Sequence, residues 1–351
     1  MARIAKIIQV SDFHFVPQVA HAKRAFYQRG LRAGCHSFSK LVGLAREIDA
    51  LQFQDRKYDA LLVTGDLSTD GSPESFSTGL SYIQSNVLAA GHPALPLTLG
   101  LNATPDRRLL LPGNHDRWDR SWFGFQRQGA VFENALNLNL PHPNYPYVRG
   151  LRNTANVSDP AVLFFVFDST PGVFARLWPW DRLARGRIDQ GAMDYCYQLA
   201  RDISQAGAGG VVTNLQGNPM TVRYSNCVRI ALLHHHPFDC QSTTLMENNK
   251  EFVRFCVRAG MHLVLFGHDH KEFWVPQFGR CDLTGKDNHQ TLFFCCPSAS
   301  EYRSEQGFYS FDLDPPGFNF TFYKWRGRQF VAGGLDENSR FLAGGPQRFY
   351  F

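Results

Sequence analysis

The feature that most constrains the fold is that five short apolar segments each run directly into a cluster of Asp, Asn or His residues. The segments span residues 6–11, 59–64, 108–112, 228–234 and 262–266. Their short length and continuous apolar character predict strands that are buried on both faces. Because open α/β sheets bind ligands beyond the carboxyl ends of their strands, we expect a ligand site where these clusters meet.

The rest of the chain predicts an α/β protein, because helix-like spacing separates the apolar segments. Helices are expected over 38–53, 74–90, 189–206 and 247–259, and a further strand over 161–167. Segments 291–295, 307–312 and 319–325 are predicted to be consecutive antiparallel strands, and 328–351 carries no clear pattern. Residues 117–160 and 170–188 are expected to be long binding loops. We find no repeat and no linker, so a single domain over 1–351 is predicted.

Composition excludes several classes of protein. No apolar run approaches the roughly 20 residues that cross a bilayer. Lys6 and Gln9 interrupt the first apolar stretch, which argues against a signal peptide, so a cytoplasmic location is expected. The 8 Cys include no CxxC pair, and most are expected to be buried and unpaired. The net charge of +5 is too small to favour nucleic acid as a partner.

The clusters consist of side chains that bind divalent metal ions. They are Asp12 and His14; Asp66 after Gly65; Asn114, His115 and Asp116 after Gly113; His234, His235 and His236 before Pro237; and His268 and His270 after Gly267. In an extended chain, residues two apart project to the same side. Each cluster alone is also typical of an ordinary turn. Together they favour Zn, Mn, Fe, Co or Ni, and they are too many for one tetrahedral ion. Two ions bridged by a carboxylate are therefore predicted, with Asp66 as the bridge.

The five clusters resemble the signature of the calcineurin-like metallophosphoesterase superfamily, D-x-H, G-D, G-N-H-D/E, H-x-P and G-H-x-H. The resemblance implies a four-layer α/β/β/α sandwich of two mixed sheets, with the metals at the carboxyl ends of strands. It assigns Asp12, His14, Asp66 and His270 to one ion, and Asp66, Asn114, His235 and His268 to the other. Among the three consecutive histidines His235 is chosen, because the family's ligand usually lies two residues before the proline.

The resemblance also implies a mechanism. A hydroxide made available near neutral pH by the metals attacks phosphorus in line. His115 stabilises the phosphoryl oxygens and protonates the leaving alkoxide. Asp116 orients His115 through a hydrogen bond, or else serves a supporting or capping role. Arg117, next to this cluster, is the predicted substrate-binding residue.

Motif details point to the phosphodiesterase branch, which includes cyclic-nucleotide phosphodiesterases. Residues 65–71 lack the Arg that serine/threonine protein phosphatases carry there, and the third cluster keeps His115, which lipid-A-type pyrophosphatases tend to replace. The segment 296–300, Cys-Pro-Ser-Ala-Ser, is also similar to that branch. A small-molecule phosphoester is the expected substrate. A metal-dependent DNA nuclease, a phosphomonoesterase and a scaffold on the same fold stay open, although a scaffold is expected to lose metal ligands.

Overall fold

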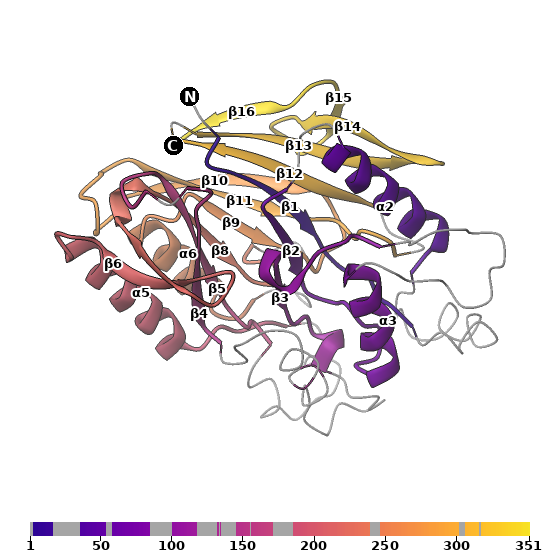
Figure 1. Cartoon of the computed structure of the whole chain (residues 1–351), viewed down its shortest axis with the longest axis horizontal. Helices are drawn as coiled ribbons and strands as arrows, with labels where there is room; N and C mark the ends of the chain where they lie inside the picture. The colour runs from indigo at the N-terminus through magenta and orange to yellow at the C-terminus, as the bar shows by residue number, and fades with distance from the viewer. Residues whose placement is uncertain are drawn as a thin grey trace.

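Two eight-stranded sheets pack face to face in the computed structural model, and helices cover their outer faces (Figure 1). The structure describes residues 3–16, 36–53, 58–84, 100–117, 132, 134, 145–154, 156–170, 185–238, 246–301, 306–315 and 317–351. The prediction of one domain over 1–351 stays a prediction. Within these described ranges, every helix is too short or too polar to cross a membrane.

The first sheet has the order β15-β14-β13-β12-β1-β2-β3, with β16 also paired to β13. Its parallel part comprises β1 (Ala5–Val10), β2 (Ala60–Thr64) and β3 (Arg108–Leu111). The antiparallel part comprises β12 (Gly307–Asp314), β13 (Gly317–Arg326), β14 (Gln329–Leu335), β15 (Phe341–Ala343) and β16 (Gln347–Tyr350). Strand β12 joins the two parts by antiparallel pairing with β1.

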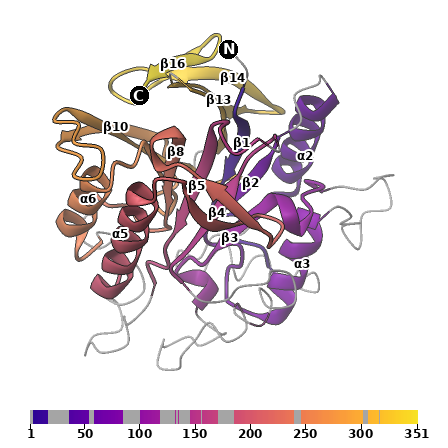
Figure 2. The same ribbon diagram turned by 60° about the vertical axis from the view of Figure 1, so that its left-hand side comes forward.

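The second sheet has the order β10-β11-β9-β8-β5-β4-β6-β7, and its strands β10, β8, β5 and β4 are labelled in Figure 2. Its central strands β11 (His289–Cys295), β9 (Leu263–Phe266), β8 (Cys227–Leu232) and β5 (Ala161–Val166) are parallel. The outer strands are β10 (Phe273–Gly279), β4 (Tyr147–Leu151), β6 (Gly210–Asn214) and β7 (Pro219–Val222). Both sheets are mixed, as predicted.

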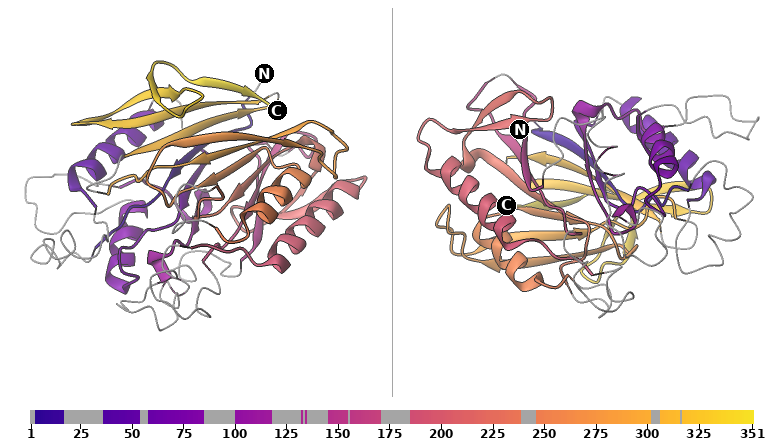
Figure 3. Two further views of the ribbon diagram at one scale, coloured as in Figure 1. Left: turned by 180° about the vertical axis from the view of Figure 1, so that it is seen from behind. Right: turned by 90° about the horizontal axis from the view of Figure 1, so that it is seen from below.

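Three apolar clusters define the four layers (Figure 3). The largest fills the space between the sheets, where the Phe294 ring contacts Tyr309, Phe311 and Phe320 edge-on. A second cluster joins the first sheet to α2 (Phe38–Phe53) and α3 (Pro73–Gln84). A third joins the second sheet to α5 (Gln190–Gln205) and α6 (Asn249–Arg258). The predicted α/β/β/α sandwich is therefore confirmed.

The helices form where an apolar stripe can face a sheet. In α5 the buried side chains are Met193, Cys196, Ala200 and Ile203, which lie on one face at helical spacing. The Asp189 carboxylate begins this helix by accepting a hydrogen bond from the Gly191 N–H at 2.7 Å. Strands β1, β2, β8 and β9 are buried along their whole length, because each lies between a helix layer and the opposite sheet.

Most predicted elements occur within two residues of their predicted bounds, but several strands were missed. The segment 291–295 was also wrongly expected to pair antiparallel with the strands that follow it, because as part of β11 it lies in the other sheet, parallel to β9. Strand β4 lies inside the predicted loop 117–160, and β6, β7 and β10 were not predicted at all. The unassigned tail 328–351 forms β14, β15 and β16. The expected helix 74–90 is described only as far as Gln84, and most of the predicted loop 170–188 lies outside the described residues. Six cysteines fall in the described ranges, and all six are buried free thiols as predicted.

Candidate metal centre

The predicted ligands gather where strands of both sheets end. Asp12, His14, Asp66 and Asn114 follow strands of the first sheet, and His268 and His270 follow β9 of the second. The Gln9 side-chain amide on β1 donates to the Phe266 carbonyl on β9 at 3.0 Å and so joins the two sheets directly beneath the site.

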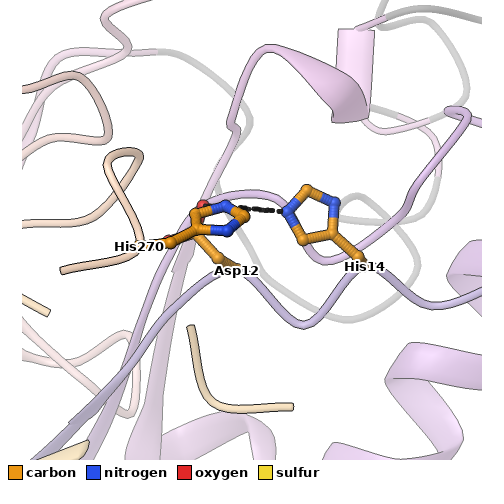
Figure 4. A group of neighbouring side chains, drawn as sticks. All are labelled: Asp12, His14 and His270. Carbon is orange, nitrogen blue, oxygen red and sulfur yellow. Dashed lines mark hydrogen bonds and ion pairs between the residues drawn. The ribbon is translucent and has the colours of Figure 1, made fainter. Parts of the chain in front are cut away.

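Asp12, His14 and His270 form the first group of ligand atoms. The Nε2 atoms of His14 and His270 lie 3.1 Å apart, and Figure 4 shows the two rings turned toward each other. His270 Nε2 is 3.2 Å from Asp12 Oδ1, and His14 Nε2 is 4.0 Å from the same oxygen. These three atoms converge on one point, as the ligands of a single ion do.

Asp66, Asn114, His234 and His268 form the second group. His234 Nε2 lies 3.4 Å from Asp66 Oδ2, 3.2 Å from Asn114 Oδ1 and 3.2 Å from His268 Nδ1. Asp66 also belongs to the first group, because its Oδ2 is 3.9 Å from His14 Nε2. One carboxylate oxygen thus lies between the two groups, as the predicted bridge requires.

Both groups fit a divalent ion. With metal–ligand bonds of about 2.0–2.2 Å, neighbouring ligand atoms stand about 3.0–3.6 Å apart. The observed separations run from 3.1 to 4.0 Å. In the first group, Asp12 Oδ1 is buried without a hydrogen-bond donor, which suits a carboxylate oxygen that binds a cation; His14 Nδ1, His235 Nε2 and His268 Nε2 are likewise buried without a partner.

The electrostatics prepare most of these side chains for metal binding. Burial lowers the pKa of His14 to about 3 and that of His268 to about 4, so both imidazoles are neutral. Burial opposes ionisation of Asp12, but the His270 imidazole outweighs it and lowers its pKa to about 2. Burial also lowers the pKa of His234, yet Asp66 raises it to about 9, so an ion bound there displaces a proton.

The backbone at the site is strained. Asp12 and His14 both have φ of 53°, so the extended conformation expected between them was wrong. The other left-handed ligands are Asp66 (50°), His268 (80°) and His270 (55°). This region costs about 1–2 kcal/mol per residue for side chains other than glycine, and Asp and His are among those that enter it most often. Strain of this kind gathers at functional sites.

Two glycines in the motifs are required by close approach of the backbone. A Cβ on Gly113 would lie 2.1 Å from Asp66 Oδ1 and 2.4 Å from its backbone nitrogen. A Cβ on Gly267 would lie 1.9 Å from the Ser11 hydroxyl. Any side chain at either position would therefore push a ligand turn out of place.

The structure places His234, and not the predicted ligand His235, against Asp66 and Asn114. The Nδ1–H of His234 donates to the Thr64 carbonyl at 2.8 Å, which leaves Nε2 free to face Asp66 and Asn114. A ligating histidine typically makes such a bond with its second nitrogen. The position where β8 ends, and not the distance to Pro237, determines which histidine lies against Asp66.

His235 has a different role, which its hydrogen bonds define. The Ser169 hydroxyl oxygen accepts from the backbone N–H groups of His234 at 3.2 Å and His235 at 3.1 Å. Since these bonds use both lone pairs, the hydroxyl donates its own hydrogen to His235 Nδ1 at 2.9 Å. The proton of neutral His235 is then on Nε2, which is buried without a hydrogen-bond partner, and the His235 ring lies beside the His268 ring with centroids 4.6 Å apart.

Asp116 does not orient His115, in contrast to the first of its two predicted roles. Its carboxylate accepts from the backbone N–H groups of Leu67 at 3.2 Å, Ser68 at 2.8 Å and Gly113 at 2.9 Å. It thereby joins the turn that carries Asp66 to the turn that carries Asn114, which is the capping role predicted as the alternative. Burial, followed by the nearby Asp66 charge, raises the pKa of Asp116 to about 7.

His115 lies beside both ligand groups. Its Nδ1–H donates to the Thr69 carbonyl at 2.8 Å, and its ring meets the His14 ring edge-on with centroids 4.8 Å apart. One of its ring nitrogens lies within 4.8 Å of ligand atoms of His14 and Asp66.

Arg117, whose substrate-binding role stays a prediction, contacts other side chains of the protein. Its guanidinium forms an ion pair with Asp168 and donates from Nε to the Thr170 hydroxyl at 3.1 Å. These contacts hold the segment that also carries Ser169. The Trp and Arg residues of 118–122 and 176–182 lie outside the described residues.

Sequence reasoning missed the hydroxyl residues that support the ligands. Thr69 and Ser169 lie in turns with no motif signal. Ser298 and Ser300 lie in the Cys-Pro-Ser-Ala-Ser segment, whose similarity to phosphodiesterases was the one available sign of their importance.

Comparisons with known proteins agree with this geometry. A family model described as calcineurin-like phosphoesterase matches residues 5–272. We found no match among curated proteins. Among solved structures, GAP50, the anchor in the inner membrane complex of Plasmodium, is 10% identical with a TM-score of 0.52, and the match covers 94% of this chain and 87% of that one. This likeness shows the fold alone.

Two further solved structures match with lower scores. A predicted phosphoesterase from Streptococcus pneumoniae is 13% identical over 98% of this chain and 99% of that one, with a TM-score of 0.34. Vps29 from Entamoeba histolytica, complexed with Zn²⁺, is 10% identical over 93% of this chain and 96% of that one, with a TM-score of 0.33.

Proposed function

This chain belongs to the calcineurin-like phosphoesterase family, and from that membership we propose that it hydrolyses phosphodiesters with the help of two divalent metal ions. The observation that carries the proposal is the pair of ligand groups that share Asp66. A single structural ion would need only one such group. Two ions about 3.5–4 Å apart are the usual means of cleaving phosphoesters by in-line displacement.

The proposed assignment of ligands follows the contacts. Asp12, His14, Asp66 and His270 would hold one ion, and Asp66, Asn114, His234 and His268 would hold the other. When bound, two such ions activate a water molecule as nucleophile and neutralise charge on the phosphoryl oxygens. Mn, Fe, Zn, Co and Ni all suit this mixture of carboxylate, amide and imidazole ligands.

We assign the proton transfer to His115. Because a carbonyl oxygen can only accept, the bond to Thr69 keeps a proton on Nδ1 and leaves Nε2 to exchange a proton with the substrate. In its protonated form His115 donates from Nε2 to the leaving oxygen, which is general acid catalysis. Asp116 supports this step indirectly, since it fixes the turn from which His115 projects.

The choice of a phosphodiester rests on the motif details and on similarity to the phosphodiesterase branch. A small-molecule substrate is proposed because a net charge of +5 is small for a DNA-binding protein of 351 residues. A cytoplasmic location is proposed with it, supported by the six described cysteines, which are free thiols. GAP50 is an anchor in the inner membrane complex of Plasmodium, so a scaffold on this fold is the alternative that the experiment must address.

The test is a hydrolysis panel on purified protein supplied with Mn²⁺. The substrates are a chromogenic phosphodiester, the matching monoester, cyclic AMP and single-stranded DNA. We expect cleavage of the diester, and its loss in Asp66→Asn, because that change unbalances both ion positions. Asp59→Asn is the matched control, since Asp59 precedes the same strand β2 that Asp66 follows, and its carboxylate accepts from the Lys6 backbone N–H at 2.7 Å.

Each alternative has its own result. Preferred cleavage of the monoester makes the protein a phosphomonoesterase, and salt-sensitive cleavage of DNA makes it a nuclease. Protein that binds no metal and cleaves none of the four substrates contradicts the proposal and favours a scaffold.

A further inference from the structure

Three consecutive carbonyls in the loop that carries Asp12 and His14 each accept a hydrogen bond from a different buried hydroxyl. Ser298 Oγ donates to the Asp12 carbonyl at 2.6 Å, and Ser300 Oγ donates to the Phe13 carbonyl at 2.9 Å. Thr69 Oγ1 donates to the His14 carbonyl at 2.7 Å. All three hydroxyl residues are at most 1% exposed, so water does not compete for these bonds.

The N–H groups of the same loop are held from another direction. The backbone N–H groups of Asp12 and His14 donate to the carbonyls of Gly65 and Asp66, both at 3.0 Å. The Phe15 N–H continues the series with a bond of 2.9 Å to the Leu67 carbonyl. The loop is therefore fixed through its amides by the turn after β2, and through its carbonyls by the hydroxyls, with a further bond of 3.1 Å from the His36 N–H to the His14 carbonyl.

The bond from Ser298 has a defined direction. Its oxygen accepts from the backbone N–H groups of Glu301 at 2.8 Å and Ser300 at 3.4 Å. Since these two bonds use both lone pairs, the hydroxyl hydrogen is left for the Asp12 carbonyl. The segment 298–301 thus holds the hydroxyl as well as the loop.

These bonds are needed because the loop adopts a strained conformation. Asp12 and His14 both have φ of 53°, with Phe13 between them. Such a backbone persists only where its surroundings hold it. If the carbonyls were released, relaxation of either residue would move a carboxylate or an imidazole away from the convergence point shown in Figure 4.

We infer that Ser298, Ser300 and Thr69 are positioning residues that set the metal affinity of the group formed by Asp12, His14 and His270. Ser298 and Ser300 follow β11 of the second sheet, and Thr69 follows β2 of the first. The hydroxyls therefore make this affinity depend on how the two sheets are joined. The inference rests on the metal centre proposed above and does not depend on which phosphoester is cleaved.

The test measures Mn²⁺ binding to metal-free protein by calorimetry in wild type, Thr69→Val and Ser300→Ala. Loss of a group that supports a metal ligand typically lowers affinity by about 10–100-fold. We expect that loss at one of the two ion positions and no change at the other. The variant His14→Ala shows which of the two binding events belongs to the group formed by Asp12, His14 and His270.

Thr291→Val is the matched control. Thr291 is also fully buried, and its hydroxyl also donates to a carbonyl at 2.7 Å, but that carbonyl belongs to Met261, remote from the site. A thermal melt without metal shows what each variant loses in stability alone. We expect Thr291→Val to lower stability and leave both Mn²⁺ affinities unchanged.

Three results would overturn the inference. Unchanged Mn²⁺ affinity in Thr69→Val and Ser300→Ala would show that the loop holds its shape without the hydroxyls. Equal losses in Thr69→Val and Thr291→Val would show a general effect of stability. Wild-type protein that binds no Mn²⁺ would refute the metal centre as well, whereas two bound ions without activity would refute only the proposed phosphodiesterase.

Discussion

Replacing His234 or its neighbour His235 by alanine distinguishes the two candidate ligands. His234 Nε2 lies within 3.4 Å of Asp66, Asn114 and His268, whereas His235 is held by Ser169. The two substitutions are chemically identical and adjacent, and both side chains are buried. We expect His234→Ala to lose one of two bound ions, and His235→Ala to keep both.

The size of the effect follows from the contacts. Loss of a supporting residue lowers metal affinity by about 10–100-fold, so loss of a direct ligand should exceed about 100-fold. An ion present at 100 times its Kd stabilises the folded protein by about 2.7 kcal/mol, and after a 100-fold loss of affinity only about 0.4 kcal/mol remains. With an unfolding entropy of about 2.1 cal/mol/K for each of the 351 residues, that difference lowers Tm by about 3 °C.

The assay pairs metal analysis after dialysis with melting curves recorded with and without Mn²⁺. His234→Ala should retain one ion per chain and show the smaller Mn²⁺-dependent rise in Tm, and His235→Ala should behave as wild type in both measurements. If His235→Ala loses an ion and His234→Ala does not, the hydrogen-bond argument from Ser169 is wrong and the choice of His235 by its distance from Pro237 stands.

Two further predictions concern His115 and the acid stability of the fold. His115→Ala should keep both ions and lower kcat by about 100- to 10,000-fold, and loss of metal in this variant would contradict its assignment as a proton donor. Burial and the nearby Arg229 hold the pKa of His262 far below its usual value, so below about pH 6.5 the unfolded chain takes up a proton that the folded chain does not. The free energy of unfolding from this source is unaffected above pH 6.5 and falls below it, by about 1.4 kcal/mol per pH unit. Urea unfolding of His262→Phe at several acid pH values should therefore show a free energy of unfolding that depends less steeply on pH, by this amount. An unchanged pH dependence would refute the reasoning.

The buried strands and the ligand types could be predicted from the sequence because both are local properties. Strands β1, β2, β3, β8 and β9 consist mostly of apolar residues, since both of their faces are covered. The Asp, Asn and His residues that follow them are visible without any tertiary information. The strands that were missed lack this signal: β10 is half-exposed and contains Pro276, which an edge strand tolerates, and β6 has only one buried residue.

The roles of individual side chains were harder to predict than their positions. Asp116 and Arg117 directly follow His115, the proposed proton donor, in sequence, but the structure joins them to partners far along the chain, Ser68 and Asp168. Sequence proximity to a site therefore did not establish a direct part in its chemistry. A carboxylate or guanidinium bonds whichever partners the packing brings to it, and those partners carry no local signature.

The sequence by itself determined that Asp, Asn and His residues would gather where the strands end, because strand length, strand burial and the residues after each strand are local properties of the chain. Only the tertiary structure decided which atoms meet there. His14 and His270 are 256 positions apart, and their nitrogens come within 3.1 Å because the two sheets pack against each other. The same packing brings His234 rather than His235 to Asp66, and supplies the hydroxyls that hold Asp12 and His14 in a conformation they would not adopt alone. Distances between ligand atoms depend on contacts between remote segments, and such contacts exist only once the chain has folded.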